Sequence, residues 1–221
     1  MAVKPAPEPA HKCLLACVQR GPGFRNLKIS AEFVTSAAGA DGFPKDRLPE
    51  VALVGRSNVG KSSLLNALMR QSLARTSAAP GKTRLANFFR VQRGAAPALF
   101  LVDLPGYGYA RGGDASAREF NQLADAYVNR PGHRGLILLV DSRHPGLESD
   151  MDAWQWLQSL PWPGAVIGTK VDKLTRAERA RHGRKFETLF DIPVPLVSAL
   201  TGEGLDELWK MIANLPKATA A

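Results

Sequence analysis

The sequence has few cysteines, and it has no apolar stretch long enough to cross a membrane. Of its 221 residues only Cys13 and Cys17 are cysteines, and no further thiol lies near them. This pattern favours free, reduced thiols over a disulfide framework or a zinc site. The longest apolar runs, such as Leu136–Val140, have the length of a strand. The apolar segment Leu14–Val18 is too short for a secretory signal, so we expect a cytoplasmic protein that does not associate with a membrane.

Acidic residues are fewer than basic ones. The chain has 20 Asp and Glu against 29 Lys and Arg, which gives a formal net charge of +9. An excess of this size favours a polyanionic partner such as RNA or DNA, and the alternative is a basic surface that needs no partner. One basic stretch falls on a predicted helix, where it is either an RNA contact or a solvated face. It comprises Arg176, Arg179, Arg181, His182, Arg184 and Lys185.

The composition excludes disorder of the whole chain. With 45% hydrophobic and 22% charged residues, a chain of 221 residues can bury one sizeable core. Residues 1–27 are rich in Pro, Gly and small side chains, so we predict a flexible N-terminal extension. Residues 28–216 are predicted to form a single domain, and residues 217–221 a C-terminal tail.

Strand-like and helix-like segments alternate along the predicted domain. This order is typical of an α/β fold with a mostly parallel sheet and helices on both faces. The predicted strands are Ile29–Thr35, Val51–Val54, Leu85–Val91, Ala98–Val102, Gly135–Val140, Ala165–Gly168 and Pro195–Val197. The predicted helices are Ser62–Arg70, Ala115–Asn129, Met151–Leu160, Arg176–Phe190 and Leu205–Leu215. The link between the third and fourth strands is too short for a parallel crossover, so this pair is predicted to be antiparallel.

The segment after the strand Val51–Val54 has the pattern of a phosphate-binding loop. It reads Gly55-Arg56-Ser57-Asn58-Val59-Gly60-Lys61-Ser62, which satisfies G-x-x-x-x-G-K-S between a strand and a helix. Its glycines let backbone N–H groups surround phosphate oxygens, and the helix N-terminus adds its dipole. We expect Lys61 to reach the outer phosphates and the Ser62 hydroxyl to bind Mg²⁺.

A second motif, Asp103-Leu104-Pro105-Gly106, follows the strand Ala98–Val102. An acid at this end of a strand beside the loop strand is placed to complete a Mg²⁺ site, and the Gly106 N–H can sense a γ-phosphate. Alone, Asp-x-x-Gly is a common turn. Together with the phosphate loop, it predicts a nucleoside triphosphate site.

Two later motifs predict the base. In Thr169-Lys170-Val171-Asp172, the Asp172 carboxylate can accept two hydrogen bonds from the N1–H and 2-amino group of guanine, which adenine cannot reproduce. The stem of Lys170 can cover the base plane, and in Val197-Ser198-Ala199 the Ala199 N–H can donate to guanine O6. These motifs predict GTP or GDP as the ligand, and they argue against an ATPase or a small-molecule kinase.

The order of the motifs resembles that of the EngB (YihA/YsxC) family of bacterial GTPases, from about Glu32 to Leu215. The distinguishing stretch is Asp103-Leu104-Pro105-Gly106-Tyr107-Gly108-Tyr109-Ala110, because many GTPases share the other motifs. The resemblance implies a three-layer small G-protein fold, Mg²⁺-dependent hydrolysis of GTP, and a role in assembling the large ribosomal subunit. It also implies a requirement in cell division and septation. We expect a monomer whose partner is the large subunit or its precursor.

The resemblance implies further site residues. Ser62 and Thr83 would ligate Mg²⁺ directly and Asp103 would complete the site. The first switch would be Gly81-Lys82-Thr83-Arg84-Leu85, and the second would extend from Asp103 to Gly113. Such loops can be ordered by a γ-phosphate and released on hydrolysis.

Two departures from the broader GTPase pattern affect the expected chemistry. Thr169 stands where Asn is commoner, which shortens one side-chain tether to the phosphate loop. Tyr107 stands where many GTPases carry a glutamine that orients the attacking water. A phenol cannot orient water in that way, so we expect slow intrinsic turnover, and the motifs assign no catalytic group beyond transition-state stabilisation by Lys61.

Asn58, inside the phosphate loop, is a candidate ligand for K⁺. Related potassium-activated GTPases carry an Asn at this place, and carbonyls between Ser77 and Lys82 would complete the shell. Such a cation would stabilise the charge of the transition state. The alternative is that Asn58 only shapes the loop through its own hydrogen bonds.

Three tryptophans and four histidines complete the list of candidates. Trp154, Trp156 and Trp162 are interpreted as packing residues and not as stacking platforms for bases. The histidines have no Ser or Cys partner in motif spacing, so nucleophilic catalysis has no support. Two functions stay open: an enzyme used as a switch, and a binding module in which the nucleotide is structural.

Overall fold

The computed structural model describes residues 27–75, 85–107, 122–132 and 134–216. The strands are β1 (Ile29–Ala37), β2 (Glu50–Gly55), β3 (Ala86–Arg93), β4 (Leu99–Asp103), β5 (Arg134–Asp141) and β6 (Gly164–Thr169). The α-helices are α1 (Lys61–Met69), α3 (Glu148–Gln158), α4 (Arg176–Phe190) and α5 (Leu205–Asn214). Two 3-10 turns are η3 (Ala40–Gly42) and η5 (Val171–Lys173), and residues 122–128 are helical. The division into residues 1–27, 28–216 and 217–221 stays a prediction, because most of both terminal segments lies outside the described residues.

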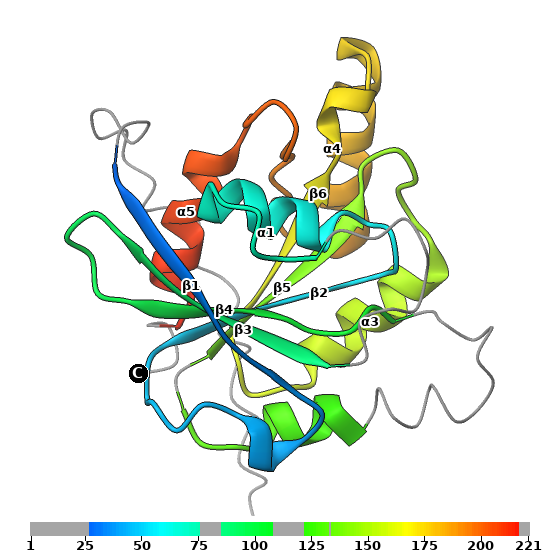
Figure 1. The fold of residues 1–221 in the computed structure, drawn as a ribbon. Coiled ribbons are helices and arrows are strands. Elements are labelled where there is room, and N and C mark those ends of the chain that lie inside the picture. The colour runs from blue at the N-terminus through cyan, green and yellow to red at the C-terminus, as the bar shows by residue number, and fades with distance from the viewer. Residues whose placement is uncertain (1–26, 76–84, 108–121, 133, 217–221) are drawn as a thin grey trace, which may run out of the picture.

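The six strands form one sheet in the order β1-β3-β4-β2-β5-β6 (Figure 1). The central strand β2 pairs in parallel with β4 and β5, and β5 pairs in parallel with β6. β3 is antiparallel to both of its neighbours, β1 and β4. The predicted mostly parallel sheet with one antiparallel strand is therefore confirmed, and so is the predicted antiparallel pair.

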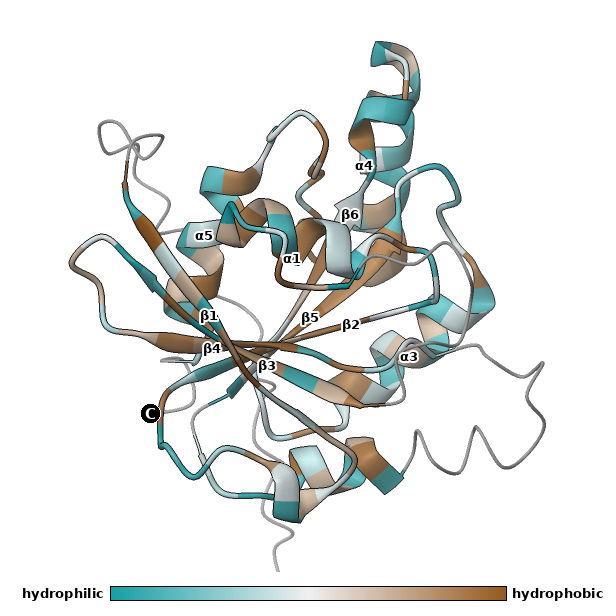
Figure 2. Ribbon diagram, viewed as in Figure 1, coloured by the Kyte–Doolittle hydropathy of each residue, from teal (hydrophilic) through white to brown (hydrophobic). Residues whose placement is uncertain are grey.

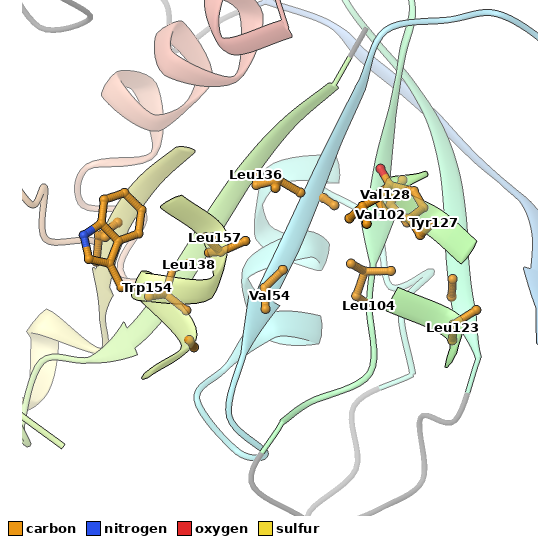
Figure 3. Packing of buried hydrophobic residues seen from close by; sticks show 14 of the residues in the cluster. Val54, Val102, Leu104, Leu123, Tyr127, Val128, Leu136, Leu138, Trp154 and Leu157 are labelled. Atoms are coloured by element: carbon orange, nitrogen blue, oxygen red, sulfur yellow. The ribbon is translucent and has the colours of Figure 1, made fainter. Parts of the chain in front are cut away.

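Helices cover both faces of the sheet. Successive residues of its buried strands point to opposite faces, so each strand contributes apolar side chains to both. On one face, Leu53 and Ile137 pack with apolar side chains of α1 and α5. On the other face, Val54 and Leu138 pack with α3, α4 and the helical residues 122–128 (Figure 3). Burial on both sides explains the near-continuous apolar runs of β2 and β5. The three-layer arrangement is confirmed.

Local signals fix the bounds of α4. The Thr175 hydroxyl accepts a hydrogen bond from the Glu178 N–H at 3.3 Å, and the Glu178 carboxylate accepts one from the Thr175 N–H at 2.8 Å. This reciprocal pair caps the first turn of a helix. The helix ends before Asp191, whose left-handed φ of 52° stops the helical path. The predicted bounds Arg176–Phe190 are those of the structure.

The predicted strand Pro195–Val197 is wrong as an extended element. Here the structure has one isolated bridge, between Leu196 and Gly168. The Val197 N–H donates to the Gly168 carbonyl at 2.7 Å, and the Gly168 N–H donates to the Pro195 carbonyl at 2.9 Å. Pro193 and Pro195 have no N–H to donate, so a longer ladder cannot form at this edge.

The tryptophans pack, as predicted. Trp154 is buried and meets the Phe190 ring edge to face, with 6.1 Å between the ring centroids. Trp156 and Trp162 are partly buried against the same core, and the Trp162 indole N–H donates to the Val128 carbonyl at 3.3 Å. Of the predicted helix Ala115–Asn129, only the part from residue 122 is described. None of the helices in the described ranges is both long and apolar enough to cross a membrane.

Candidate nucleotide-binding site

Three of the predicted motifs meet at one edge of the sheet. The phosphate loop follows β2, the Asp103 motif ends β4 and the Thr169 motif ends β6. These strands are parallel, and they are adjacent in the sheet or separated only by β5. Their carboxyl ends therefore lie along the same edge, where ligands bind in α/β sheets.

The phosphate loop needs glycine where the chain is most crowded. A Cβ on Gly55 would lie 2.8 Å from the Leu139 carbonyl oxygen and 2.9 Å from Cγ1 of Val59. Gly60, which precedes α1, has a φ of 105°, a left-handed value that favours glycine. Asn58 also has a left-handed φ of 62°, and asparagine tolerates this region better than most residues. The predicted strand–loop–helix context is present.

Lys61 turns its side chain back into the loop. Its ammonium donates to the Gly55 carbonyl at 3.0 Å, and the residue is buried. Burial lowers the pKa of Lys61, and the nearby Asp103 carboxylate opposes that shift. Within the part of the chain that the structure describes, the ammonium makes one hydrogen bond to the loop, so it can bind an anion there at little cost in reorganisation.

Asp103 has the features of an incomplete cation site. It is 3% exposed, and its Oδ2 accepts a hydrogen bond from the Ser62 hydroxyl at 3.4 Å. Its Oδ1 is buried without a hydrogen-bond partner in the described ranges. Burial raises the pKa of Asp103 to about 6, although Lys61 and Ser62 lower it. A hard divalent cation fits an unpartnered carboxylate oxygen beside a hydroxyl, so these residues suit Mg²⁺.

Gly106 lies directly on the phosphate loop. A Cβ at this position would be 3.0 Å from the Ser57 backbone N and 3.1 Å from the Lys61 Nζ. A side chain here would make a contact tighter than an ordinary one, so the Ser57 backbone or Gly106 would have to shift slightly. The predicted closeness of Gly106 to the phosphate groups is therefore consistent with the packing.

The two base motifs come together through one short hydrogen bond. The Ser198 hydroxyl donates to Asp172 Oδ1 at 2.7 Å, and its oxygen accepts from the N–H groups of Leu200 and Thr201 at 3.2 and 3.1 Å. The bond from Ser198 is the main reason that the pKa of Asp172 is lowered, so the carboxylate is charged. The Val171 N–H also donates to the Val197 carbonyl, at 3.2 Å.

The Lys170 side chain is fixed by hydrogen bonds within the protein itself. Its ammonium donates to the Asn58 carbonyl at 2.6 Å and to Asp141 Oδ2 at 2.9 Å. Its stem lies over Gly60, since a Cβ there would be 3.7 Å from Cε of Lys170. The shortened tether at Thr169 still reaches the loop, because its hydroxyl lies 2.7 Å from the Val59 carbonyl.

Asp141 is a site residue that the sequence reasoning missed. It ends β5, between the strands that carry the phosphate and base motifs. The Arg143 guanidinium donates to both of its oxygens, at 2.9 and 2.7 Å, and Lys170 shares one of them. Burial alone would raise the pKa of Asp141, but these donors hold it well below its usual range. The rule used for Asp103, an acid at the carboxyl end of a parallel strand, would also have found Asp141.

The Tyr107 hydroxyl is engaged by another side chain and is not placed like the glutamine that orients water in many GTPases. Its hydroxyl donates to Asp150 Oδ1 at 2.9 Å, and Arg56 makes an ion pair with the same oxygen at 3.0 Å. Burial raises the pKa of Tyr107 well above its usual value, so the phenol is a hydrogen-bond donor. Asp150, on α3, was also missed, because nothing in its local sequence marks it.

The remaining predicted site residues differ in whether their side chain or only their backbone can contact a ligand. Four of them point their side chains into the core, so only their backbone can face a nucleotide: Val59, Leu104, Val171 and Val197. Leu85 is 37% exposed. The first-switch residues Gly81, Lys82, Thr83 and Arg84, and the second-switch residues after Tyr107, lie outside the described residues.

This arrangement of fold and loop places the chain in the class of P-loop GTPases. A family model described as 50S ribosome-binding GTPase matches residues 50–170. The chain is 46% identical over 199 residues to a protein of Pelotomaculum thermopropionicum described as probable GTP-binding protein EngB, covering 85% of this chain and 96% of that one. A protein of the same description from Heliobacterium modesticaldum is 44% identical over 193 residues, covering 84% and 92%. The chain belongs to the EngB family of GTP-binding proteins, and it is a GTP hydrolase.

Solved structures show the same fold. A crystal structure of a probable GTP-binding protein engB has a TM-score of 0.57 and 21% identity, covering 76% of this chain and 98% of that one. Era, solved with MgGDPNP and nucleotides 1506–1542 of 16S ribosomal RNA, has a TM-score of 0.67 and 23% identity. That match covers 77% of this chain and 57% of Era, so the chain spans little more than half of Era's length. At these identities the likeness concerns the fold alone.

Proposed function

We propose that this protein uses GTP hydrolysis as a switch in the assembly of the large ribosomal subunit. The observation that carries the proposal is the family match, described as a 50S ribosome-binding GTPase, on a chain with a net charge of +9. The partner is the large subunit or its precursor, the protein acts as a monomer in the cytoplasm, and its loss impairs cell division and septation. Nucleotide state would change affinity for the particle, because a γ-phosphate orders switch segments that GDP leaves unheld.

Helix α4 offers a surface for ribosomal RNA. Two of its residues hold the helix in place: Arg179 pairs with Glu203 at 2.7 Å, and a ring nitrogen of His182 lies 2.8 Å from the Ser142 carbonyl. The other basic residues of the stretch are exposed to solvent, namely Arg176, Arg181, Arg184 and Lys185. In Figure 2 the helix extends from the body of the molecule and is largely hydrophilic. Exposed cations on a projecting helix suit phosphate contacts.

In the proposed chemistry, the described residues bind and orient the phosphate groups. Lys61 and the loop N–H groups hold the outer phosphates, and Gly106 donates its N–H to the γ-phosphate. Ser62, Asp103 and Thr83 would hold Mg²⁺, which neutralises charge on the phosphates when bound. Asp172, Lys170 and the Ala199 N–H would select guanine. Intrinsic turnover would be slow, because Tyr107 donates its hydroxyl to Asp150 and orients no water.

Co-sedimentation with ribosomal subunits tests the switch. We expect the protein to bind the large subunit or its precursor more tightly with a non-hydrolysable GTP analogue than with GDP. Reversing the charges of Arg181, Arg184 and Lys185 to Glu should weaken binding and flatten its dependence on salt, while GTP affinity stays within about twofold. Equal binding in both nucleotide states, with no stimulation of multiple-turnover hydrolysis by particles, would favour the binding module instead.

A monovalent cation is part of the proposal. The Asn58 side chain is exposed at the loop, and no hydrogen bond of its amide is found among the described residues, so its oxygen can accept K⁺. Turnover should be faster in KCl than in NaCl at equal ionic strength, and Asn58→Ala should remove the difference. Equal rates in the two salts, or stimulation that survives the substitution, would leave Asn58 as a residue that only shapes the loop.

A further inference from the structure

Two side chains from distant parts of the chain, Tyr107 and Arg56, converge on the buried carboxylate of Asp150. Asp150 lies in the first turn of α3 and is 2% exposed. Its Oδ1 accepts a hydrogen bond from the Tyr107 hydroxyl at 2.9 Å and lies 3.0 Å from Nε of Arg56. A buried carboxylate is costly unless it is paired, and here the Tyr107 hydroxyl and the charge of Arg56 offset part of the effect of burial, which raises the pKa of Asp150.

The two residues that contact Asp150 are also joined through their backbones. Arg56 and Tyr107 form an isolated parallel bridge, which links the phosphate loop to the residue after Gly106. This bridge lies beyond the ends of β2 and β4. Asp150 contacts the side chains of both residues that form it. The contact and the ion pair together fix the spacing between the two phosphate-binding motifs.

The spacing matters because Gly106 packs closely against the phosphate loop. A Cβ there would already lie 3.0 Å from the Ser57 backbone N and 3.1 Å from Lys61 Nζ. Tyr107 is the next residue, so its held hydroxyl and its backbone bridge to Arg56 restrict the backbone that carries the Gly106 N–H. Small errors in the position of such a donor cost much of its effect on a transition state.

We propose that Asp150 is a positioning residue for GTP hydrolysis: through Tyr107 and Arg56 it fixes Gly106 against the phosphate loop. Tyr107 then contributes to turnover by anchoring the second motif, although it occupies a position from which a glutamine would orient water. The inference rests on GTP hydrolysis itself and is independent of the proposed ribosomal partner.

The test compares Asp150→Asn and Tyr107→Phe with Asp152→Asn, an exposed acid on the same helix. Single-turnover hydrolysis at saturating GTP should fall about tenfold in each of the first two variants. Tyr107→Phe removes a hydrogen bond to a charged group, and Asp150→Asn removes the charge that attracts Tyr107 and Arg56. GDP affinity should stay within about twofold, because the base contacts are untouched. Asp152→Asn should hydrolyse GTP at the parental rate.

A double variant shows whether the two residues act as one unit. If they do, Tyr107→Phe combined with Asp150→Asn should be no slower than the slower single variant. Parental rates in both single variants, even with a lower melting temperature, would make the cluster a purely structural contact and overturn the proposal. Equal loss in Asp152→Asn, or strictly additive losses, would do the same. If Asp150→Asn does not fold, Tyr107→Phe, which removes only a hydroxyl, still decides the matter.

Discussion

The base end and the phosphate end of the site are built differently. At the base end, Asp172 is bonded to Ser198 and Lys170 is bonded to Asn58 and Asp141, so the reading groups are already held. At the phosphate end, Asp103 Oδ1 is buried without a partner in the part of the chain that the structure describes. The first end is preorganised, which favours specificity, whereas in the proposed site the second would be completed by its ligand.

This difference suits a switch. The base and its contacts are the same in GTP and GDP, so there is no reason for the base end to change during the cycle. The γ-phosphate and its cation are what the cycle removes, and in the proposed site they would bind where the Asp103 carboxylate is left unsatisfied. An unsatisfied buried group costs stability when the ligand is absent, so the phosphate end should couple ligand binding to conformation more strongly than the base end.

The largest effect is expected at the base end. Asp172→Asn should weaken GTP binding by roughly 2–5 kcal/mol, because two charge-assisted hydrogen bonds to guanine are lost. The variant should prefer xanthine nucleotides, since a 2-oxo group suits an amide donor. Competition titrations with GTP and XTP measure both changes. Parental GTP affinity would mean that Asp172 does not read the base.

The second prediction concerns Asp103 at the phosphate end, where a substitution is expected to increase the stability of the nucleotide-free protein. Asp103→Asn should raise the unfolding free energy of the nucleotide-free protein by about 1–3 kcal/mol, because a buried charge with an unpartnered oxygen is removed. The same variant should lose most of the increase in GTP affinity that Mg²⁺ brings. Denaturant melts without nucleotide, and binding titrations with and without Mg²⁺, give the two numbers. A destabilised apo protein would show that Asp103 is satisfied without a ligand.

Asp141→Asn should give the smallest effect and the opposite sign. Its carboxylate is fully engaged by Arg143 and Lys170, so neutralising it should lower the apo stability by about 1–2 kcal/mol. GTP and GDP affinity should fall together by a few-fold, because Lys170 loses one of the groups that hold it. Melts and titrations of both nucleotides check this. An unequal loss for GTP and GDP would mean that Asp141 acts on the phosphate end, and the contrast between the two ends would fail.

The short motifs were readable because each function depends on residues that are neighbours in sequence. Gly55 to Ser62 form one loop between a strand and a helix, and the alternation of apolar segments predicted the succession of strands and helices along the chain around it. The errors have local causes as well. The segment Pro195–Val197 is apolar enough for a strand, but its prolines limit the pairing to one bridge.

Sequence by itself determined the fold class and the motifs, since periodicity and spacing are properties of a short stretch of chain, and the resemblance of those motifs to known proteins gave the GTPase family. Tertiary structure alone decided which groups support those residues. Asp141 and Asp150 lie far in sequence from Lys170, Tyr107 and Arg56, and they meet them only because β5 and α3 pack beside the loop strand. Whether a buried carboxylate is paired, as in Asp141, or left incomplete, as in Asp103, depends on what folding brings within hydrogen-bond distance, and no local pattern records that.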